Sequence, residues 1–408
     1  MENESEKECL MQDDALEFLP RTRRMVEDPH GYYKRLRAAE PVYWSETSNC
    51  WVLTRYQDVN DVLKDPRFGR GTTYRIIAKS DAEMNAVEQL RSNLLPFKDG
   101  EEHARIRSGM NDLFHTRVTK LQPKIQRLAE SLLDKVEGQE RFDIIEDYAY
   151  PLSVGVISYL LGIPEEDKDI FKEYSPHFAA LLVPKKTKDD IAMATILIKE
   201  LNAYFTALID KNREGEHDNI IYDMLNANRE KEVFTSSELL VMPIFLIFAG
   251  HETTMNMIGN GMYELFKQPD QLQKMIDGPE LINSAVEELL RITSTNAALY
   301  RIAFEDVEIG GKVIKKGDEI VAVLAAANRD PERFSDPDRI DITRKDGAHI
   351  AFGAGIHHCL GATMGRVEAR IGYETLLRRF PGIKLAEEPE WKSSFVFRGL
   401  KRLIVSTK

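Results

Sequence analysis

One cysteine, Cys359, lies in an unusual setting. The stretch 352–361, FGAGIHHCLG, places it in a loop with three glycines, directly after two histidines. Glycine is used where the backbone turns sharply or approaches a flat surface, because it has no Cβ. Apolar residues at three- and four-residue spacing follow, so we expect Cys359 to lie at a helix N-terminus. Amide donors and the helix dipole would lower the thiol pKa there and favour the thiolate, which is the form that binds metal.

A buried free cysteine in a glycine-rich turn is the alternative for any single cysteine taken without its surroundings. The other two cysteines, Cys9 and Cys50, share no CxxC spacing with Cys359. Neither a zinc ribbon nor a disulfide framework is therefore expected. We expect Cys9 to lie in a flexible tail of residues 1–15, and Cys50 to be inert among strand-like residues.

Polar residues also interrupt the most apolar part of the chain. Residues 239–250 read LLVMPIFLIFAG, and the sequence AGHETT, 249–254, overlaps their end. Burying an acid and two hydroxyls in an apolar helix is unfavourable unless they have partners or a function. A structural alternative is that Thr253 donates to the carbonyl of Ala249 and bends the helix, while Glu252 points to solvent.

Positioning these residues requires a large helical framework. Apolar residues at helical spacing predict helices over 121–136, 192–211 and 281–292. A capping box of Thr235 and Glu238 predicts the start of a long helix, which has no clear stop before Pro269. At about 1.5 Å per residue this helix spans on the order of 50 Å, enough to cross a domain.

Strand signals are fewer and lie toward the two ends of the chain. Residues 41–56 predict one hairpin around the polar SETSN, and residues 306–314 predict another around Gly310 and Gly311. The run EIVAVLAAA, 319–327, predicts a buried strand that the turn sequence NRDP ends. The fold class is therefore mainly α with minor β.

Length and charge narrow the class of protein. The 408 residues contain no repeat, low-complexity tract or long linker, which favours one domain over residues 1–408. A net charge of −12 argues against a nucleic-acid-binding surface, which needs concentrated Lys and Arg. The acidic N-terminus lacks the features of a secretory signal, and the apolar run 239–250 is shorter than the roughly 20 residues of a membrane span. We expect a cytoplasmic protein without a membrane span.

The cysteine stretch resembles the haem-binding signature of the cytochrome P450 family. The six matching positions are Phe352, Gly353, Gly355, His357, Cys359 and Gly361. The resemblance implies that the Cys359 thiolate is the axial ligand of the iron of haem b, iron protoporphyrin IX. It further implies that Phe352 packs near the ligand sulfur and that His357 faces a haem propionate. His358 has no role in this interpretation.

The polar centre of the apolar helix is similar to the distal helix of the same family. On this resemblance Glu252 and Thr253 organise water and deliver protons to dioxygen. Ala249 and Gly250 lie against the haem, and Gly250 leaves room for its face and for dioxygen. The implied fold has a long central helix, a haem between distal and proximal helices, and a small β portion.

Glu288 and Arg291 match the ExxR motif, which in the family holds the scaffold around the cysteine loop. Only the resemblance indicates this role, because such a pair occurs on the surface of many helices. The residues PERF, 331–334, and DITR, 341–344, follow before the cysteine loop. Whether Arg333 or Arg344 meets the ExxR pair stays open.

Three cationic or donor residues resemble the propionate partners of the family. His103 and Arg107 match an HxxxR motif, and Arg301 stands where the family has a propionate-binding arginine. Arginine suits carboxylates because its planar fork can donate two parallel hydrogen bonds. The preceding FKDGEE differs from the DPPE-like sequence often found at this point.

The resemblance implies a monooxygenase that inserts one atom of O2 into a lipophilic small molecule by hydroxylation or epoxidation. No flavin or iron–sulfur module is recognisable, so a separate ferredoxin or flavodoxin with its reductase would supply electrons, docking on basic residues in 103–120 and 366–379. One alternative is a peroxide-driven or redox-neutral haem-thiolate enzyme, against which Glu252 and Thr253 argue. The other is a haem sensor or carrier without turnover.

Residues 71–95 and 178–197 are expected to form a mobile lid over the substrate. Their apolar content favours a fatty-acyl chain, terpenoid, steroid or polyketide as ligand. The expected substrate contacts, taken from the family layout, are Phe245, Phe248, Ala249, Ala297, Ala298 and Phe395.

Overall fold

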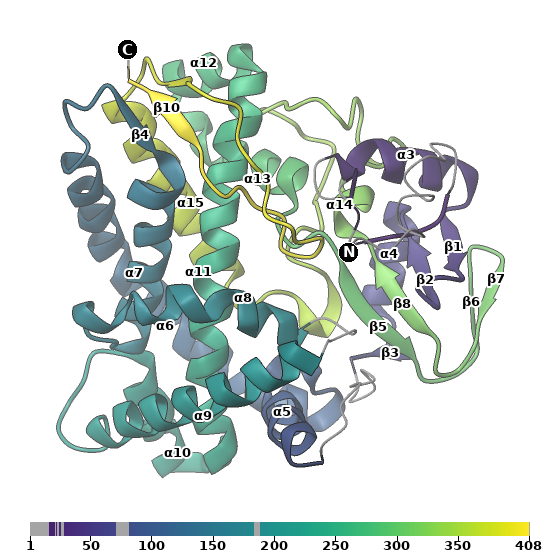
Figure 1. Cartoon of the computed structure of the whole chain (residues 1–408), viewed down its shortest axis with the longest axis vertical. Helices are drawn as coiled ribbons and strands as arrows, with labels where there is room; N and C mark the ends of the chain where they lie inside the picture. Colours follow the sequence, from purple (N-terminus) through teal and green to yellow (C-terminus); the bar gives the residue numbers. More distant parts are fainter. Residues whose placement is uncertain are drawn as a thin grey trace.

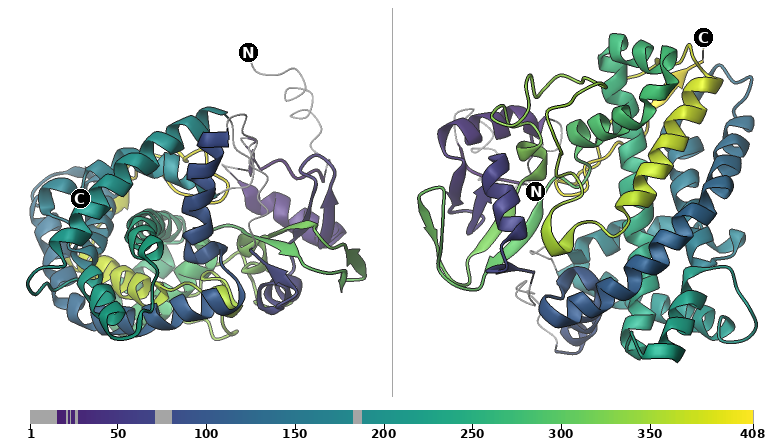
Figure 2. Two further views of the ribbon diagram at one scale, coloured as in Figure 1. Left: turned by 90° about the horizontal axis from the view of Figure 1, so that it is seen from below. Right: turned by 180° about the vertical axis from the view of Figure 1, so that it is seen from behind.

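A long apolar helix, α11 (Ser236–Lys267), runs through the middle of the helical part of the protein (Figures 1 and 2). The computed structural model describes residues 16–20, 22, 24–25, 28–70, 81–182 and 188–407. The predicted capping box is confirmed, because the Thr235 side chain accepts from the Glu238 amide while the Glu238 side chain accepts from the Thr235 amide. Pro243 lies inside the helix without ending it.

Helices from distant parts of the chain pack around α11. It contacts α7, α13, α15, α8 and α9, and α15 also packs against α6. Glycine permits some of these contacts, since a Cβ on Gly250 of α11 would lie 2.7 Å from the Ile157 side chain of α7. The helices of the described residues are α3 (Pro29–Ala39), α4 (Tyr56–Lys64), α5 (Asp81–Asn93), α6 (Gly100–Asp134), α7 (Tyr150–Leu161), α8 (Ile170–Leu182), α9 (Lys188–Lys211), α10 (Ile220–Lys231), α12 (Pro269–Asp277), α13 (Ile282–Thr293), α14 (Leu324–Ala327) and α15 (Ala362–Arg379).

Most of the β portion lies to one side of the helices, whereas β4 and β10 lie among the helices (Figure 1). Its main sheet has the order β1-β2-β8-β5-β3, in which β2 and β8 are parallel and the other neighbours are antiparallel. Both predicted hairpins are confirmed as β1–β2 and β6–β7. The strands are β1 (Val42–Ser45), β2 (Cys50–Leu53), β3 (Phe68–Gly69), β4 (Arg141–Asp143), β5 (Leu299–Ala303), β6 (Val307–Ile309), β7 (Lys312–Ile314), β8 (Glu319–Ala322), β9 (Lys384–Leu385) and β10 (Ile404–Ser406).

The prediction of one buried strand over 319–327 is wrong in its second half. β8 ends at Ala322, and residues 324–327 form the short helix α14. Alanine is the strongest helix former, so the run Ala325–Ala327 favours a helical turn. Every residue of α14 is buried, and an apolar run that is buried on all sides does not reveal its backbone conformation.

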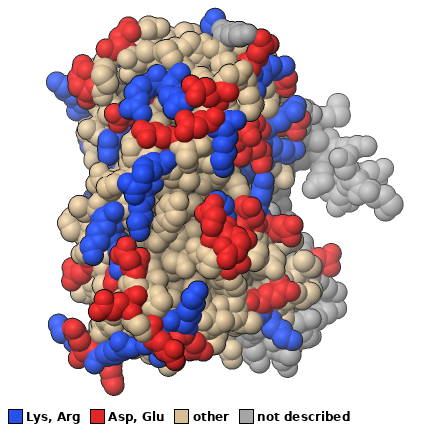
Figure 3. Space-filling view, turned by 90° about the vertical axis from the view of Figure 1, so that its left-hand side faces the viewer, with Lys and Arg blue, Asp and Glu red and all other residues tan. Residues whose placement is uncertain are grey.

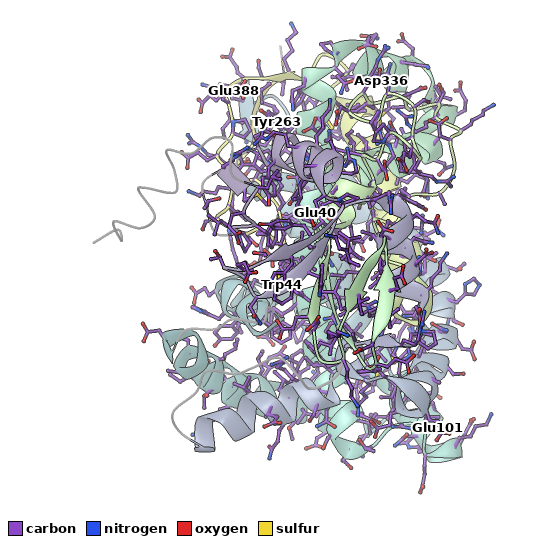
Figure 4. All side chains as sticks on the ribbon, turned by 90° about the vertical axis from the view of Figure 1, so that its right-hand side faces the viewer. Glu40, Trp44, Glu101, Tyr263, Asp336 and Glu388 are labelled. Atoms are coloured by element: carbon purple, nitrogen blue, oxygen red, sulfur yellow. The ribbon has the colours of Figure 1, made fainter. Side chains whose placement is uncertain are left out.

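Near the C-terminus, residues 390–401 form a loop that we call the C-terminal hairpin. A bridge pairs Trp391 with Leu400, and the Lys392 amide donates to the Gly399 carbonyl at 2.9 Å. The far end pairs with the segment before β5, where the Ala297 amide donates to the Val396 carbonyl at 2.8 Å. Just before the hairpin, Glu388 accepts a hydrogen bond of 3.1 Å from the Tyr263 hydroxyl of α11, and Figure 4 shows both side chains in the same part of the molecule.

Two helices are long and apolar enough to cross a membrane by length and composition, namely 192–211 within α9 and α11. In α11 the apolar window is 67% buried, which is the pattern of a core helix, whereas in α9 the value is 39%. The expectation of no membrane span stays a prediction. On the face shown in Figure 3, Lys and Arg alternate with Asp and Glu.

Several expectations fall on parts of the chain that the structure leaves undescribed. The predicted tail, with Cys9, and residues 71–80 and 183–187 of the predicted lid lie outside the described residues. The described remainder of the lid segments belongs to α5, α8 and α9. Cys50 is buried in β2, so the expectation that strand residues surround it is confirmed, and its inertness stays a prediction.

Candidate active site

The cysteine loop is built by a tight backbone arrangement directly before α15. The Cys359 amide donates to the Phe352 carbonyl at 2.9 Å, which closes the loop. Gly353 and Gly355 both have φ of +71°, a region that side-chain-bearing residues rarely adopt. A Cβ on Gly355 would also lie 2.3 Å from the Leu63 carbonyl oxygen. The prediction that a glycine-dependent loop presents Cys359 just before a helix is confirmed.

The protonation of Cys359 differs from the sequence-based expectation. The residue is exposed to solvent, yet many protein atoms surround its sulfur at longer range. This burial raises the pKa of the thiol, while the Gly361 amide and the charges of Arg107 and Arg366 act in the opposite direction. The expected lowering by the helix N-terminus is therefore wrong for the free thiol. Metal coordination would itself require and stabilise the thiolate.

The ExxR pair is buried and forms a two-pronged ion pair. Arg291 donates from Nε and Nη2 to the two carboxylate oxygens of Glu288, with both distances at 2.8 Å. Arg291 also donates from Nη1 to the carbonyls of Asn328 and Pro337, at 2.7 and 2.8 Å. The Asn328 side chain in turn accepts from the Ile350 amide at 2.8 Å, two residues before Phe352. Hydrogen bonds thus connect α13 to the start of the cysteine loop.

The structure decides between the two candidate partners of this pair. Arg344 donates from Nε to both oxygens of Glu288 at 3.1 Å and from Nη1 to Asp346 at 2.7 Å. Arg333 instead places its guanidinium 5.1 Å from the ring centroid of Tyr56. Arg344 is therefore the third member of the ExxR cluster.

A second ion pair supports the loop and was not predicted from the sequence. Arg366 of α15 donates to both oxygens of Glu287, at 2.6 and 3.0 Å, and its guanidinium lies 4.6 Å from the ring centroid of Phe352. His349 lies 3.2 Å from the same carboxylate. Burial acts to raise the pKa of Glu287, but the bonds from His349 and Arg366 lower it to about 2. The position of Glu287 beside Glu288 in α13 is the one sequence signal for this role.

Two histidines predicted to serve the cofactor lie edge to face with ring centroids 4.5 Å apart. His357 Nε2 pairs with Asp99 Oδ1 at 2.9 Å, and Asp99 Oδ2 accepts from the Arg70 amide at the same distance. Burial and the nearby charges of His357 and Arg107 lower the pKa of His103 to about 4, so His103 is neutral near pH 7. Asp99 was missed, although an acid directly before a helix is a common N-terminal signal.

The two predicted arginines use their donors differently. Arg107 donates from Nη1 to the His358 carbonyl at 2.6 Å and from Nε to Asn111 at 2.9 Å, so it is tied to the cysteine loop. Arg301 is buried in β5 and donates from Nη1 to the Tyr300 carbonyl at 2.9 Å. Contacts of either arginine with a propionate stay predictions.

These residues fit a haem. The loop offers one exposed cysteine as a sulfur ligand, and buried His103 has an Nε2 atom with no hydrogen-bond partner among the described residues. His357 and Arg301 lie close enough for the arginine charge to lower the pKa of the histidine, and both side chains carry donors of the kind that two carboxylates need. Cys359 would bind the iron, and the His and Arg side chains would hold the propionates.

The polar centre of α11 combines features of both sequence-based alternatives. Thr253 donates to the Ala249 carbonyl at 2.9 Å, as in the structural alternative. Glu252 does not point to solvent, because its side chain is only 17% exposed and burial raises its pKa. Gly250 faces Ile157, so its predicted role toward a haem and dioxygen stays a prediction.

The predicted substrate contacts fall into two apolar clusters. Ala297, Ala298 and Phe395 belong to one cluster around the C-terminal hairpin. Phe245 and Phe248 of α11 belong to the large helical core, where Phe248 stacks on Phe178 of α8 with centroids 4.2 Å apart. Contact with a substrate stays a prediction for these five residues and for Ala249, which belongs to neither cluster.

The predicted docking patch is less cationic than its composition indicates. Arginines of α15 pair with acids, which are Glu287 for Arg366, Glu374 for Arg370, Glu130 for Arg378, and Asp134 and Glu137 for Arg379. Within α6, Arg117 pairs with Asp218 and Asp223. A partner would therefore meet mixed charge over these residues.

Curated relatives extend over nearly the whole chain. A profile of the family described as Cytochrome P450 matches residues 27–278 and 273–395. The biotin biosynthesis cytochrome P450 of Bacillus subtilis is 35% identical over 385 residues, which are 93% of this chain and 96% of that protein. The cytochrome P450 monooxygenase PikC of Streptomyces venezuelae is 37% identical and covers 92% of this chain and 90% of its own.

Solved structures agree with the sequence matches. The crystal structure of P450BioI in complex with a hexadec-9Z-enoic acid ligated acyl carrier protein has a TM-score of 0.89 and 33% identity, covering 95% of this chain and 100% of that one. A Bacillus megaterium P450 in complex with testosterone has a TM-score of 0.85 and 33% identity, with the same coverage. Since the matches span nearly the full length and relatives are themselves named oxygenases, the chain belongs to the cytochrome P450 family of haem-thiolate monooxygenases.

Proposed function

We propose that this monooxygenase binds haem b and hydroxylates or epoxidises a lipophilic small molecule, with electrons from a separate ferredoxin or flavodoxin and its reductase. The observation that carries the proposal is the Glu252 carboxyl, largely buried in the otherwise apolar middle of α11 and adjacent in sequence to Thr253. An acid in such a place needs a function or a partner to offset its burial. Relatives in bacterial biosynthesis support a cytoplasmic metabolic role.

The bound haem would supply oxygen activation and atom transfer, which protein side chains cannot perform. The chain supplies the rest. Cys359 is the sulfur ligand, and the ExxR cluster fixes the loop that presents it. Burial raises the pKa of Glu252, which makes its carboxyl hold a proton more readily than an exposed acid does. The Thr253 hydroxyl can give up its bond to the Ala249 carbonyl and orient water beside Glu252.

The apolar residues near the C-terminal hairpin support a lipophilic substrate. Ala297, Ala298 and Phe395 present small and aromatic surfaces, and such surfaces gain free energy by excluding water from an apolar ligand. Two related structures are complexes, one with a fatty acyl group on a carrier protein and one with a steroid. Ligands of this chemistry are the first to test.

The test is turnover by the haem-loaded protein with a surrogate ferredoxin and reductase. We expect binding spectra with members of a lipophilic library and incorporation of one labelled oxygen atom from O2 into the product. Turnover with peroxide alone would favour the peroxide-driven alternative. Binding without any oxygen consumption would favour a sensor or carrier.

Two threonines provide a matched pair of variants. Thr253→Ala should keep substrate binding but divert electrons to peroxide, by about tenfold or more relative to product, because a positioned proton donor contributes roughly 10²–10⁴-fold. Thr254 also donates to a carbonyl one turn earlier, that of Gly250 at 3.1 Å, but its side chain is buried. Thr254→Ala should leave the ratio of product to peroxide unchanged. Equal ratios in both variants would contradict the role of Thr253.

A further inference from the structure

The charged side chain that faces Glu252 comes from the C-terminal hairpin. Lys392 Nζ lies 3.9 Å from Glu252 Oε1. On the same helix, His251 is turned away, since its Nε2 lies 2.7 Å from the Ser175 hydroxyl of α8 and its Nδ1 lies 2.6 Å from the Ile247 carbonyl. The acid of the proposed reaction therefore has a lysine as its ionic partner.

Lys392 has a second polar contact on α11. Lys392 Nζ also lies 3.5 Å from Asn256 Oδ1, one helical turn after Glu252. A Cβ on Gly399, opposite Lys392 in the hairpin, would lie 2.1 Å from the same oxygen, so glycine lets the hairpin lie directly on α11. One turn further, Asn260 Nδ2 donates to the Arg398 carbonyl at 2.9 Å.

A polar stripe of α11 thus faces the hairpin along two turns. Glu252, Asn256 and Asn260 are spaced by four residues, which places them on one side of a helix. Each contacts the hairpin through a hydrogen bond or an ion pair. The hairpin also carries Phe395, so the same loop borders the expected substrate region and the acid.

Lys392 connects Glu252 to solvent. Its side chain is 29% exposed, against 17% for Glu252. Burial raises the pKa of Glu252 and lowers that of Lys392, while each charge stabilises the other. Glu146 raises the pKa of Lys392 further, and Lys172 of α8 lowers it. Without the lysine, burial would act alone and favour the neutral acid.

We propose that Lys392 is a positioning residue for Glu252, which it holds as the carboxylate beside a path to solvent. This inference rests on the proposed function of Glu252. A proton from water binds one carboxylate oxygen of Glu252 and later leaves the same carboxyl group toward Thr253. Glu252 then returns to the carboxylate, and Lys392 keeps its charge throughout.

The first measurement is the titration of Glu252 by infrared spectroscopy in the haem-loaded protein, with the carboxyl band assigned by its loss in Glu252→Gln. In Lys392→Met the band of the protonated acid should persist to a pH about one unit higher, because a cation within 4–6 Å lowers a carboxyl pKa by roughly 1–3 units. Lys392→Arg should restore the titration. Lys401 is an exposed lysine of the same hairpin, paired with Glu390 at 3.3 Å, so Lys401→Met is the control.

The second measurement is the pH dependence of coupling, meaning product formed per electron consumed. Its midpoint should move upward in Lys392→Met, return in Lys392→Arg and stay unchanged in Lys401→Met. If the methionine variant does not fold, Lys392→Gln removes the charge and keeps a hydrogen-bond donor for Asn256. Identical titrations of Glu252 with and without the lysine charge would overturn the inference, whereas a normal titration shift without any turnover would instead refute the proposed function.

Discussion

Behind the cysteine loop, Glu288 accepts hydrogen bonds of 2.8–3.1 Å from Arg291 and Arg344, and the remaining donors of both arginines reach backbone carbonyls or Asp346. In the middle of α11 the polar groups are held less tightly. Glu252 lies 3.9 Å from Lys392, and the buried Asn256 Nδ2 and Asn260 Oδ1 have no hydrogen-bond partner among the residues that the structure describes.

The difference separates two uses of buried polar groups. A saturated cluster has one low-energy arrangement, because breaking any bond leaves a charge unpaired in a low dielectric. Such a cluster suits a ligand sulfur that must stay in one place. A loosely partnered acid has a perturbed pKa and can exchange protons, which a saturated carboxylate resists. The Glu288 cluster therefore suits a group that must stay in position, whereas Glu252 of α11 suits a group that must exchange protons.

The largest effect should come from breaking the saturated cluster. Arg291→Ala leaves Glu288 buried with one partner fewer, and removing one member of a buried pair costs roughly 3–5 kcal/mol. We expect a loss of this size in the free energy of unfolding from a urea titration, together with loss of the haem-thiolate absorbance. A loss below about 1 kcal/mol would show that the cluster adds little to the fold.

A smaller loss of stability should distinguish Arg344 from Arg333, the two candidate partners of the ExxR pair. Arg344→Ala removes the hydrogen bond that its Nε shares between the two oxygens of Glu288, and one bond to a charged group is worth roughly 1.5–3 kcal/mol. Arg333→Ala, the matched control, removes a contact with the Tyr56 ring worth roughly 0.5–1 kcal/mol. Urea titrations of both variants measure the difference. Equal losses would contradict the assignment of Arg344 to the cluster.

Local sequence signals predicted local structure well. The capping box at Thr235, both hairpins and the cysteine loop before α15 depend on residues within a few positions of one another. They could be predicted because turns, caps and periodicity are encoded by neighbouring residues. The helix in the second half of 319–327 could not be predicted, because a buried alanine run is compatible with either a helix or a strand.

Contacts between distant segments were missed or left open. Asp99 and His357 are 258 positions apart, and Lys392 meets Glu252 only because the C-terminal hairpin lies on α11. Lys392 stands in no recognisable pattern, and the place of Asp99 directly before α6 indicates a helix start but not a pairing with His357. The pairing depends on how loops are placed on the helical framework, which a single sequence does not state.

The smallest effect concerns acid. It tests whether the contact of His251 between α8 and α11 loses stability at a higher pH than the Glu287 ion pair does. Burial lowers the pKa of His251 to about 4 from an ordinary 6.5, even though its bond to the Ile247 carbonyl acts in the opposite direction. A group with a lowered folded-state pKa contributes stability that is complete above the unfolded value, near 6.5, and is lost as the pH falls toward 4. At pH 5.5 the loss is about 1 kcal/mol, from 1.36 kcal/mol per unit.

The proximal acid Glu287 behaves differently, because its pKa of about 2 keeps its contribution intact down to about pH 4.5, where the unfolded carboxyl begins to take up protons. Hydrogen exchange measured between pH 7 and 5, corrected for the intrinsic pH dependence of exchange, should therefore show protection falling where α8 meets α11, while α13 around Glu287 keeps its protection. The contact of His103 with His357 should weaken in the same range, because burial lowers the pKa of both histidines. His251→Gln should remove the loss where α8 meets α11, since glutamine does not titrate. Equal loss of protection at the α8–α11 contact and at Glu287 of α13 would mean that these two regions do not differ in the way their polar groups are held.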